Sequence, residues 1–400
     1  MGRDGERAPA RSTDAVHAGV PRRRPGHTLA PAIAQTATYT FESTADLERY
    51  MRGDDPDAER EEYGRYGNPT VRELERRVAA LEGAEDAVAF ASGMGAITGV
   101  ALALLKAGDH VVLFEDCYRR TRLLVTGTLS RFGIQSTIIP TTDLDALDAA
   151  VRPETRLVIS ESPTNPYLHC IDLEGLASVA RAHGRARTLV DATFASPVNT
   201  RPIDFGIDLV AHSATKYLSG HNDVLGGVVA GPRPLVGLLR EARGITGSVL
   251  DPHAAFLIGR GLKTLGIRMD RHNATGLCVA ERLARHPNVE RVFYPGLPSH
   301  PSHAVAARQM RGFGGVVSLV VRGGRAAAAR VVDGCRLARI APSLGGVESL
   351  VEQPAIMSFF DLTTEELEER GIDPGLIRLS LGVEDTEDVV TDLLRALDGA

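Results

Sequence analysis

Short apolar runs alternate with amphipathic stretches between residues 68 and 230, and this alternation limits the possible folds more than any other feature. The runs expected to be strands are residues 110–114, 134–139, 156–160, 187–190, 208–212 and 227–230. Helical patterns lie between several of them, at 119–131, 143–151 and 172–183. Such alternation predicts a mainly parallel sheet covered by helices. Ligands bind sheets of this kind at the carboxyl ends of the strands.

The pattern changes at both ends of this region. A helix is expected to begin at Pro69, capped by Asn68, and to end at Gly83. Residues 1–27 have no periodicity and predict a flexible arm. After Asp251, a long helical stretch over 252–286, a strand over 316–321 and a helix over 326–332 predict a second, smaller α/β domain.

Composition excludes several classes of protein. The net charge of -6 argues against a nucleic-acid partner. The four cysteines are far apart and include no C-x-x-C pair, which favours free thiols over a disulfide frame or metal site. Residues 87–105 carry no charge, but Gly93, Gly95 and Gly99 interrupt them, so a buried strand and helix are expected rather than a membrane span. With no signal-peptide pattern, we expect a cytoplasmic protein.

Lysine is rare in this chain, which narrows the search for a catalytic amine. The lysines are Lys106, Lys216 and Lys263. Lys216 follows an expected strand, where burial favours loss of its proton, and the hydroxyls of Ser213 and Thr215 beside it suit a phosphate. A surface lysine in a loop is the alternative on this segment alone.

Two further features favour a pyridoxal cofactor over that alternative. Asp191 ends the expected strand at 187–190, where a carboxylate could hold the ring nitrogen of pyridoxal protonated. The turn Ser92–Gly95, written by letter as SGMG, can bring backbone N–H groups to a phosphate at a helix start. Its spacing is not that of a dinucleotide site, so a nicotinamide enzyme is not expected.

Long strings of the sequence resemble one family. They include EYGRYGNPT at 62–70, ESPTNP at 161–166, HSATKY at 212–217, GHND at 220–223, YPGLPSHP at 294–301, GFGGVVS at 312–318, QPAIMS at 353–358 and GVED at 382–385. From about Val16 to Leu394 the chain resembles the Cys/Met-metabolism enzymes that depend on pyridoxal 5'-phosphate (PLP), and within them the plant-type cystathionine γ-synthases. The resemblance implies the α/β fold of PLP-dependent transferases (aspartate aminotransferase-like). It divides the chain into an arm at 1–62 that contacts a neighbouring subunit, a large PLP-binding domain at 63–251 and a C-terminal domain at 252–400.

The resemblance also implies residue roles. Lys216 would carry PLP as a Schiff base, Asp191 would pair with the ring nitrogen and Tyr118 would stack on the ring. Other cofactor contacts would come from Gly93, Met94, Asn165, Thr193, Ser213 and Thr215, with Tyr63 and Arg65 supplied by a neighbouring subunit. The substrate would meet Arg378, Ser343, Glu348, Arg120 and Tyr63. A homo-oligomer, most simply a tetramer with shared sites, and no metal are expected.

The expected reaction is γ-replacement on O-phospho-, O-succinyl- or O-acetyl-homoserine, with cysteine as the thiol and cystathionine as the product. Glu348 favours cystathionine chemistry over a methionine lyase. Arg120 would favour the phosphate ester; the alternative is that Arg119, Arg120 and Arg122 form the solvated start of a helix. A γ-lyase that acts on cystathionine or another γ-substituted amino acid remains the alternative, because the same machinery serves elimination. A role in specialised metabolism, or an inactive cofactor-binding protein, also stays open.

Overall fold

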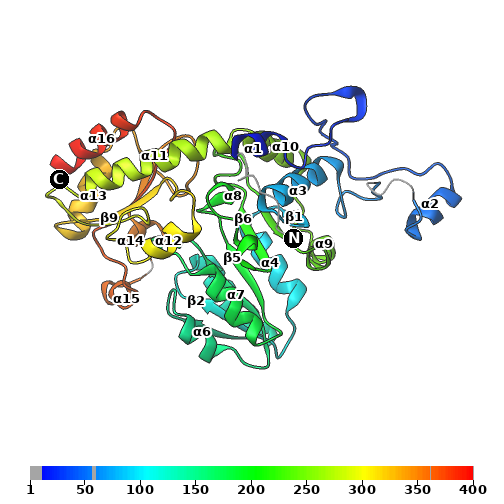
Figure 1. The fold of residues 1–400 in the computed structure, drawn as a ribbon, viewed down its shortest axis with the longest axis horizontal. Coiled ribbons are helices and arrows are strands. Elements are labelled where there is room, and N and C mark those ends of the chain that lie inside the picture. The colour runs from blue at the N-terminus through cyan, green and yellow to red at the C-terminus, as the bar shows by residue number, and fades with distance from the viewer. Residues whose placement is uncertain (1–10, 56–59, 361, 400) are drawn as a thin grey trace, which may run out of the picture.

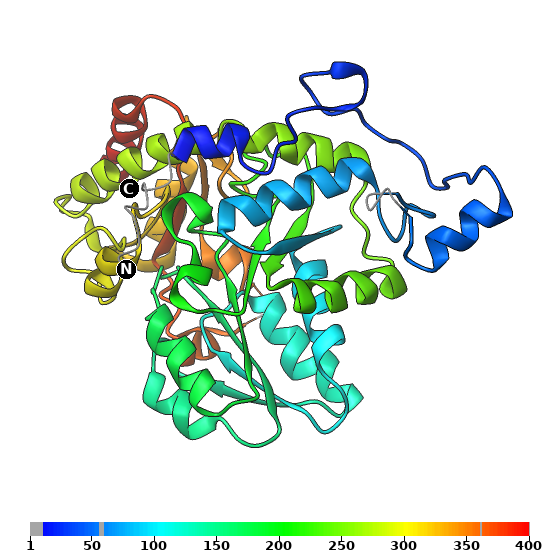
Figure 2. The ribbon, with the colours of Figure 1, turned by 45° about the vertical axis from the view of Figure 1, so that its right-hand side comes forward.

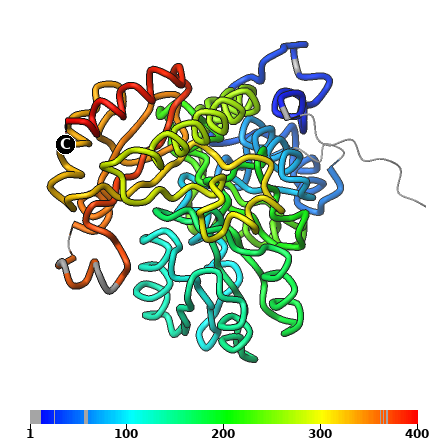
Figure 3. The backbone as a smooth tube through the Cα atoms, turned by 60° about the vertical axis from the view of Figure 1, so that its left-hand side comes forward, coloured from blue at the N-terminus to red at the C-terminus, as the bar shows by residue number. Residues whose placement is uncertain are grey.

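The computed structural model describes residues 11–55, 60–360 and 362–399. They form two sheets, each with its own helices (Figure 1). The larger sheet occupies the centre of the view and the smaller one lies to the left, with the long helix α11 (Leu265–Leu283) crossing from one to the other. The tube drawing shows the same two lobes from another side (Figure 3).

The large sheet has seven strands in the order β1-β7-β6-β5-β4-β2-β3. The strands are β1 (Asp86–Phe90), β2 (His110–Phe114), β3 (Gln135–Ile139), β4 (Thr155–Glu161), β5 (Arg187–Asp191), β6 (Leu209–Ser213) and β7 (Gly227–Gly231). Neighbours from β6 to β3 run parallel, whereas β7 runs antiparallel to both β6 and β1. The mainly parallel sheet predicted from the sequence is therefore confirmed, and every expected strand lies within two residues of its predicted bounds.

Helices cover this sheet. They are α3 (Pro69–Glu82), α4 (Gly93–Leu104), α5 (Arg119–Leu123), α6 (Leu144–Ala150), α7 (Leu173–Ala182), α8 (Ser196–Asn199), α9 (Arg233–Thr246) and α10 (Pro252–Leu262). Asn68 caps α3 by accepting from the backbone N–H groups of Thr70 and Val71, and Gly83 ends the helix in the left-handed region, as predicted. The helix expected over 119–131 is wrong in part: α5 passes into a π turn at Leu124–Thr128 and a 3-10 turn at Leu129–Phe132.

The second sheet has five strands in the order β10-β11-β12-β9-β8. They are β8 (Val289–Phe293), β9 (Val316–Val321), β10 (Arg339–Ile340), β11 (Leu350–Glu352) and β12 (Leu376–Ser380). Its helices are α12 (His303–Gln309), α13 (Gly324–Gly334), α14 (Pro354–Met357), α15 (Thr364–Glu369) and α16 (Thr386–Asp398). The single helical stretch expected over 252–286 is instead two helices, α10 and α11, which separate at Lys263 and Thr264.

The N-terminal segment runs along the large domain and then projects from it (Figure 2). Residues 1–10 lie outside the described part of the chain, but the expectation of a flexible arm is wrong from Arg11 onward. Arg11–His17 form helix α1, which packs on α11, and the carbonyl of the buried Ala15 accepts a 2.8 Å hydrogen bond from Arg77. Beyond it, the segment that carries α2 (Thr44–Met51) extends to the right of the body in Figure 1.

The uncharged stretch 87–105 forms β1 and α4, as predicted. Residues 87–90 are buried in the sheet, and most of the apolar residues of α4 pack against the same core. Within the described residues, no helix has both the length and the apolar character needed to cross a bilayer.

Candidate active site

A cavity of about 620 Å³ opens where β4, β5 and β6 end and α4 begins. This is the edge at which parallel sheets bind ligands. The large domain contributes Ser92, Gly93, Met94, Ile97, Tyr118, Arg119, Arg120, Thr121, Glu161, Asn165, Asp191, Thr193, Phe194, Ser213, Thr215, Lys216 and Leu225 to its wall. The small domain contributes Pro342, Ser343, Leu344, Glu352, Met357, Ser358 and Arg378. The cavity therefore lies between the two domains.

Lys216 reaches into this cavity from the turn that follows β6. Its Nζ donates to Ser343 Oγ at 2.6 Å. Burial, together with the nearby positive charge of Arg378, lowers the pKa of Lys216 to about 8. The uncharged form of this amine, which a nucleophile or a base requires, is therefore far more populated near neutral pH than in an ordinary lysine.

Asp191 ends β5 on the same side of the sheet. Its Oδ1 accepts from the backbone N–H of Thr193 at 3.0 Å and from the Thr193 hydroxyl at 2.5 Å. The Thr193 Oγ1 in turn accepts from the backbone N–H of Ser213, which ties β5 to the segment that carries Lys216. Burial raises the pKa of Asp191, and the two hydrogen bonds from Thr193 oppose that rise.

The start of α4 forms a tight loop against β6. Ser92 caps the helix by accepting from the backbone N–H of Gly95 at 3.0 Å. A Cβ atom at Gly93 would lie 2.8 Å from Ser213 Cβ and 3.1 Å from Ser213 Cα, so only glycine allows this approach. The free N–H groups at the helix start consequently lie close to the Ser213 hydroxyl, an arrangement suited to an anion.

Arg378 projects from β12 and is buried. Its Nη1 donates to Asn165 Oδ1 at 2.9 Å and its Nη2 to the Ser343 carbonyl at 3.0 Å. Glu352, its register partner on β11, forms an ion pair with it at 2.9 Å. Arg378 Nε has no hydrogen-bond acceptor within residues 11–55, 60–360 and 362–399. Ser343, which accepts the hydrogen bond from Lys216, has φ at 96°, a strained conformation for serine.

Tyr118 and Glu161 form a contact that sequence reasoning missed. Glu161 ends β4 beside Asp191 in register, and its Oε2 accepts from the backbone N–H of Tyr118 at 2.8 Å. Burial and the adjacent Asp191 raise the pKa of Glu161 well above its usual range. Glu161 stands first in the string ESPTNP at 161–166, so its position at a strand end was the one available signal. Glu352 was also missed, because only the pairing of β11 with β12 places it beside Arg378.

Comparison with known proteins assigns the family. The family model for "Cys/Met metabolism PLP-dependent enzyme" matches residues 12–398. Cystathionine γ-synthase 1, chloroplastic, of Nicotiana tabacum is 45% identical over 96% of this chain and 71% of its own length. The corresponding protein of Arabidopsis thaliana is 47% identical over 92% of this chain, which spans 64% of that relative. The chain belongs to the Cys/Met metabolism family of PLP-dependent enzymes.

Other members of this family are similar to the chain over nearly their whole length. L-methionine γ-lyase of Pseudomonas putida is 43% identical over 97% of this chain and 97% of its own length. O-succinylhomoserine sulfhydrylase of Pseudomonas aeruginosa is 44% identical over 96% of this chain and 94% of its own. The crystal structure of metB from Corynebacterium glutamicum matches with a TM-score of 0.90 at 38% identity, covering 97% of both chains. These likenesses confirm the PLP-dependent transferase fold expected from the sequence.

The cavity fits PLP, the cofactor of this family. Lys216 supplies an amine of lowered pKa, and Asp191 keeps Oδ2 available beyond the two bonds that Thr193 makes to Oδ1. The loop at Gly93, with Ser213 and Thr215 on the facing wall, would hold the phosphate. Asn165 and Tyr118 would flank the ring. These are the residues that the sequence singled out for the cofactor within one chain.

Three expected residues lie outside the cavity. Arg65 donates to the Gly244 carbonyl at 2.5 Å and its guanidinium lies over the rings of Tyr63 and Tyr66. Glu348 accepts from Asn222 Nδ2 at 2.7 Å and is exposed. Arg120, in contrast, lines the cavity, is exposed and forms no hydrogen bond or ion pair within the described part of the chain.

Proposed function

We propose that the chain catalyses PLP-dependent γ-replacement on an activated homoserine ester, with cysteine as the thiol and cystathionine as the product. One observation carries the proposal: a single cavity holds the Lys216 amine, the buried Asp191 carboxylate and the Arg378 guanidinium. These are the groups needed to activate an α-amino acid on PLP. The names of the relatives, cystathionine γ-synthase and O-succinylhomoserine sulfhydrylase, support replacement at Cγ.

The side chains divide the work. PLP supplies the electron sink that acidifies the hydrogens of the bound amino acid. Asp191 holds the ring nitrogen protonated, and Arg378 binds the α-carboxylate in a two-pronged contact in place of its present acceptors. Lys216 Nζ, whose pKa burial lowers to about 8, takes the proton from Cα in its uncharged form and returns it later. Tyr118 covers the ring and limits the access of water.

A γ-lyase reaction is the second candidate. The L-methionine γ-lyases of Pseudomonas putida and Fusobacterium nucleatum, at 43% and 42% identity, support it. Replacement and elimination diverge after the γ-substituent has left. In replacement a thiolate would add at Cγ, whereas in elimination Cγ would take up a proton and the released product would be hydrolysed to an α-keto acid and ammonia. Purified protein should therefore be assayed against a panel of γ-substituted amino acids, with and without cysteine. Cystathionine formed only when cysteine is present supports replacement; α-keto acid and ammonia at an undiminished rate in its presence would refute it.

Further proposals concern substrate and location. We infer that the preferred ester is O-phosphohomoserine, because the guanidinium of Arg120 lies at the cavity wall and has no partner among the residues that the structure describes. Glu348 would hold the distal ammonium of cysteine from the rim, after exchange of its Asn222 partner. A role in specialised metabolism stays compatible with the same machinery. We also propose a cytoplasmic location.

We propose further that the chain forms a homotetramer in which residues 1–62 contact a neighbouring subunit and Tyr63 and Arg65 complete that subunit's cofactor site. Residues 63–251 and 252–400 would be the two domains. The position of Tyr63 and Arg65 outside their own cavity supports this arrangement. Mixing Lys216→Ala with Arg65→Ala subunits should restore activity, because one kind of hybrid site has both residues intact. Full subunit exchange without recovery would exclude shared sites.

A further inference from the structure

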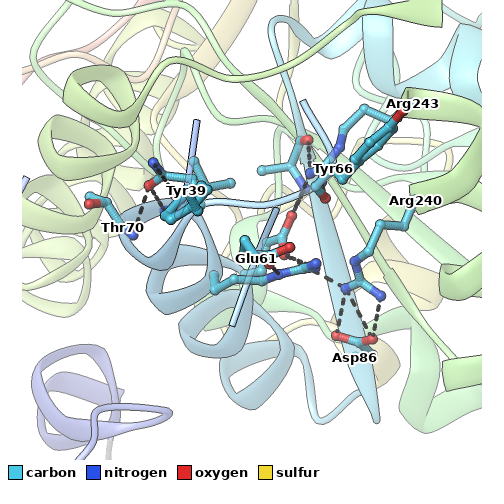
Figure 4. A network of polar contacts seen from close by, with 12 residues as sticks. Tyr39, Glu61, Tyr66, Thr70, Asp86, Arg240 and Arg243 are labelled. Carbon is cyan, nitrogen blue, oxygen red and sulfur yellow. Dashed lines mark hydrogen bonds and ion pairs between the residues drawn. The ribbon is translucent and has the colours of Figure 1, made fainter. Parts of the chain in front are cut away.

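A network of buried and partly buried charges lies behind the loop that carries Tyr63 and Arg65 (Figure 4). It contains three carboxylates, Glu61, Glu75 and Asp86, and three guanidiniums, Arg72, Arg240 and Arg243. The network joins the end of the N-terminal segment to α3, β1 and α9. The formal charges balance, and each of these six side chains forms at least one ion pair with another of them.

Glu75 is the centre of this network. It is 1% exposed, as is Arg243. Its Oε1 accepts from Arg243 Nη1 at 2.7 Å and from the backbone N–H of Ala89 at 2.9 Å. Its Oε2 accepts from Arg72 Nη1 at 3.1 Å, and Arg72 Nε donates to Glu61 at 2.9 Å. Arg240 Nη2 lies 3.6 Å from the same oxygen.

Arg243 connects Glu75 to the loop that carries Tyr63 and Arg65. Its Nη1 also donates to the Ala89 carbonyl at 3.0 Å, and its Nη2 donates to the Tyr66 carbonyl at 2.9 Å. The next residue of α9, Gly244, accepts from Arg65 at 2.5 Å. Two consecutive residues of one helix thus hold two consecutive residues of the loop, and Figure 4 shows Arg243 lying against Tyr66.

Stability alone explains this arrangement poorly. A buried ion pair adds little net stability over apolar side chains of similar volume, whereas it fixes the relative positions of the groups it joins. We propose that Arg243, held by Glu75, is a positioning residue that sets the Tyr63–Arg65 loop for the cofactor phosphate of the neighbouring subunit. The proposal rests on the shared site inferred above and extends it to residues that touch neither cofactor nor substrate.

The test uses hybrid dimers in which only one of the two cofactor sites can attach PLP. A chain with Lys216→Ala cannot attach PLP, so a wild-type partner supplies the reporting site and the Lys216→Ala chain supplies its loop. When that chain also carries Arg243→Lys, which keeps a cation beside Glu75 but lacks the fork to Tyr66, the dissociation constant for PLP should rise about tenfold. It is measured by absorbance titration of cofactor-free hybrids purified through two tags.

Three further hybrids serve as controls for the effect of Arg243→Lys on PLP binding. Arg240→Lys is the matched control, because it changes the same helix and network without a contact to the loop, and it should change the constant less than threefold or so. In a second hybrid, Arg243→Lys is placed in the chain that keeps Lys216, and the partner carries Lys216→Ala. Its dissociation constant for PLP should stay near that of the hybrid formed by wild-type and Lys216→Ala chains. Glu75→Gln, placed in the loop-supplying chain, should act like Arg243→Lys and serves if the latter does not assemble.

The outcomes separate this inference from the shared site itself. Arg65→Ala in the loop-supplying chain must weaken PLP binding if sites are shared; if it has no effect, the shared site and the inference both fail. If Arg65→Ala weakens binding while Arg243→Lys and Glu75→Gln leave it unchanged, only the inference is overturned. An equal effect of Arg240→Lys and Arg243→Lys would also overturn it, since the effect would then be one of general stability.

Discussion

Lys216 lies beside a guanidinium and a hydroxyl rather than a carboxylate at hydrogen-bond distance. Its Nζ donates to Ser343, and Arg378 adds positive charge to a buried position. Burial and the positive charge of Arg378 disfavour the ammonium form. Glu352 works in the opposite direction but is already paired with Arg378. Reactivity of this amine is thus a property of the cavity before the cofactor enters.

That environment predicts a pH dependence for the cofactor-free protein. Acylation of Lys216 should rise as pH increases through about 8, because the ammonium form below this pH is not nucleophilic. Peptide mass spectrometry after timed labelling measures it, with Lys106 outside the cavity as the internal reference. Arg378→Met should move the midpoint to higher pH. A midpoint near the ordinary 10.5 in the wild-type protein would contradict the assignment.

Arg120 gives a prediction about the leaving group. The kcat/KM for O-phosphohomoserine should exceed that for the succinyl and acetyl esters. Arg120→Ala should lower it by an amount that corresponds to a loss of about 2 kcal/mol in transition-state stabilisation, the range of a hydrogen bond between charged groups. Arg122→Ala, on the same helix but outside the cavity wall, is the control. Equal losses for all three esters, or a wild-type preference for the acetyl ester, would refute the prediction.

Among the elements, β1 and α4 form the part of the site that depends most on backbone geometry. Gly93 lies against Ser213 so closely that a Cβ has no room. The glycine therefore sets the distance between the start of α4 and β6, and with it the width of the anion site.

Gly93→Ala should weaken PLP binding about tenfold, because the loop must shift away from Ser213 to admit the methyl group. Gly237→Ala is the matched control, since it lies in α9 with nothing within 4 Å of the added Cβ. It should stabilise the protein by about 0.5 to 1 kcal/mol without changing cofactor affinity. Titration with PLP and thermal unfolding measure the two effects; equal affinities for both variants would contradict the crowding argument.

Elements governed by local chemistry could be predicted from the sequence, and those governed by distant contacts could not. Asn68, Pro69 and Gly83 set the bounds of α3 through caps that involve only neighbouring residues. The stretch after Arg119 has helical periodicity, yet it changes to a π turn at Leu124. Glu352 gave no local signal, because its role beside Arg378 depends on the register of β11 and β12.

At the scale of the whole molecule, the cavity lies between the two domains, and residues of both form its wall. Arg378 of the small domain donates to Asn165 of the large domain, and Arg119 Nη1 of α5 donates to the Ser358 carbonyl at 2.6 Å. Ser358 and Met357 belong to the cavity wall. The alternation pattern predicted both domains, but how they meet depends on contacts across more than 200 residues of chain, such as this one.

Arg119→Met should loosen the cover over the cavity. The KM for the preferred ester is expected to rise about fivefold with little change in kcat, because the lost hydrogen bond positions a wall rather than a reacting group. Arg122→Met removes a guanidinium from the same helix without a contact to Ser358 and is the control. Steady-state kinetics decides: similar KM changes in both variants would show that Arg119 has no special part in closure.

The order of strands has a consequence for synthesis on the ribosome. β1 leads directly into the loop at Gly93, but β1 lies at the edge of the described sheet and pairs with β7, where Phe90 is opposite Gly227. The loop therefore cannot be fixed until the chain has emerged beyond β7, after Lys216 itself. Arg378 follows only near the C-terminus. A nascent chain consequently exposes Lys216 well before Arg378 is available to lower the pKa of its amine, and only a chain extended through β12 brings the two residues together.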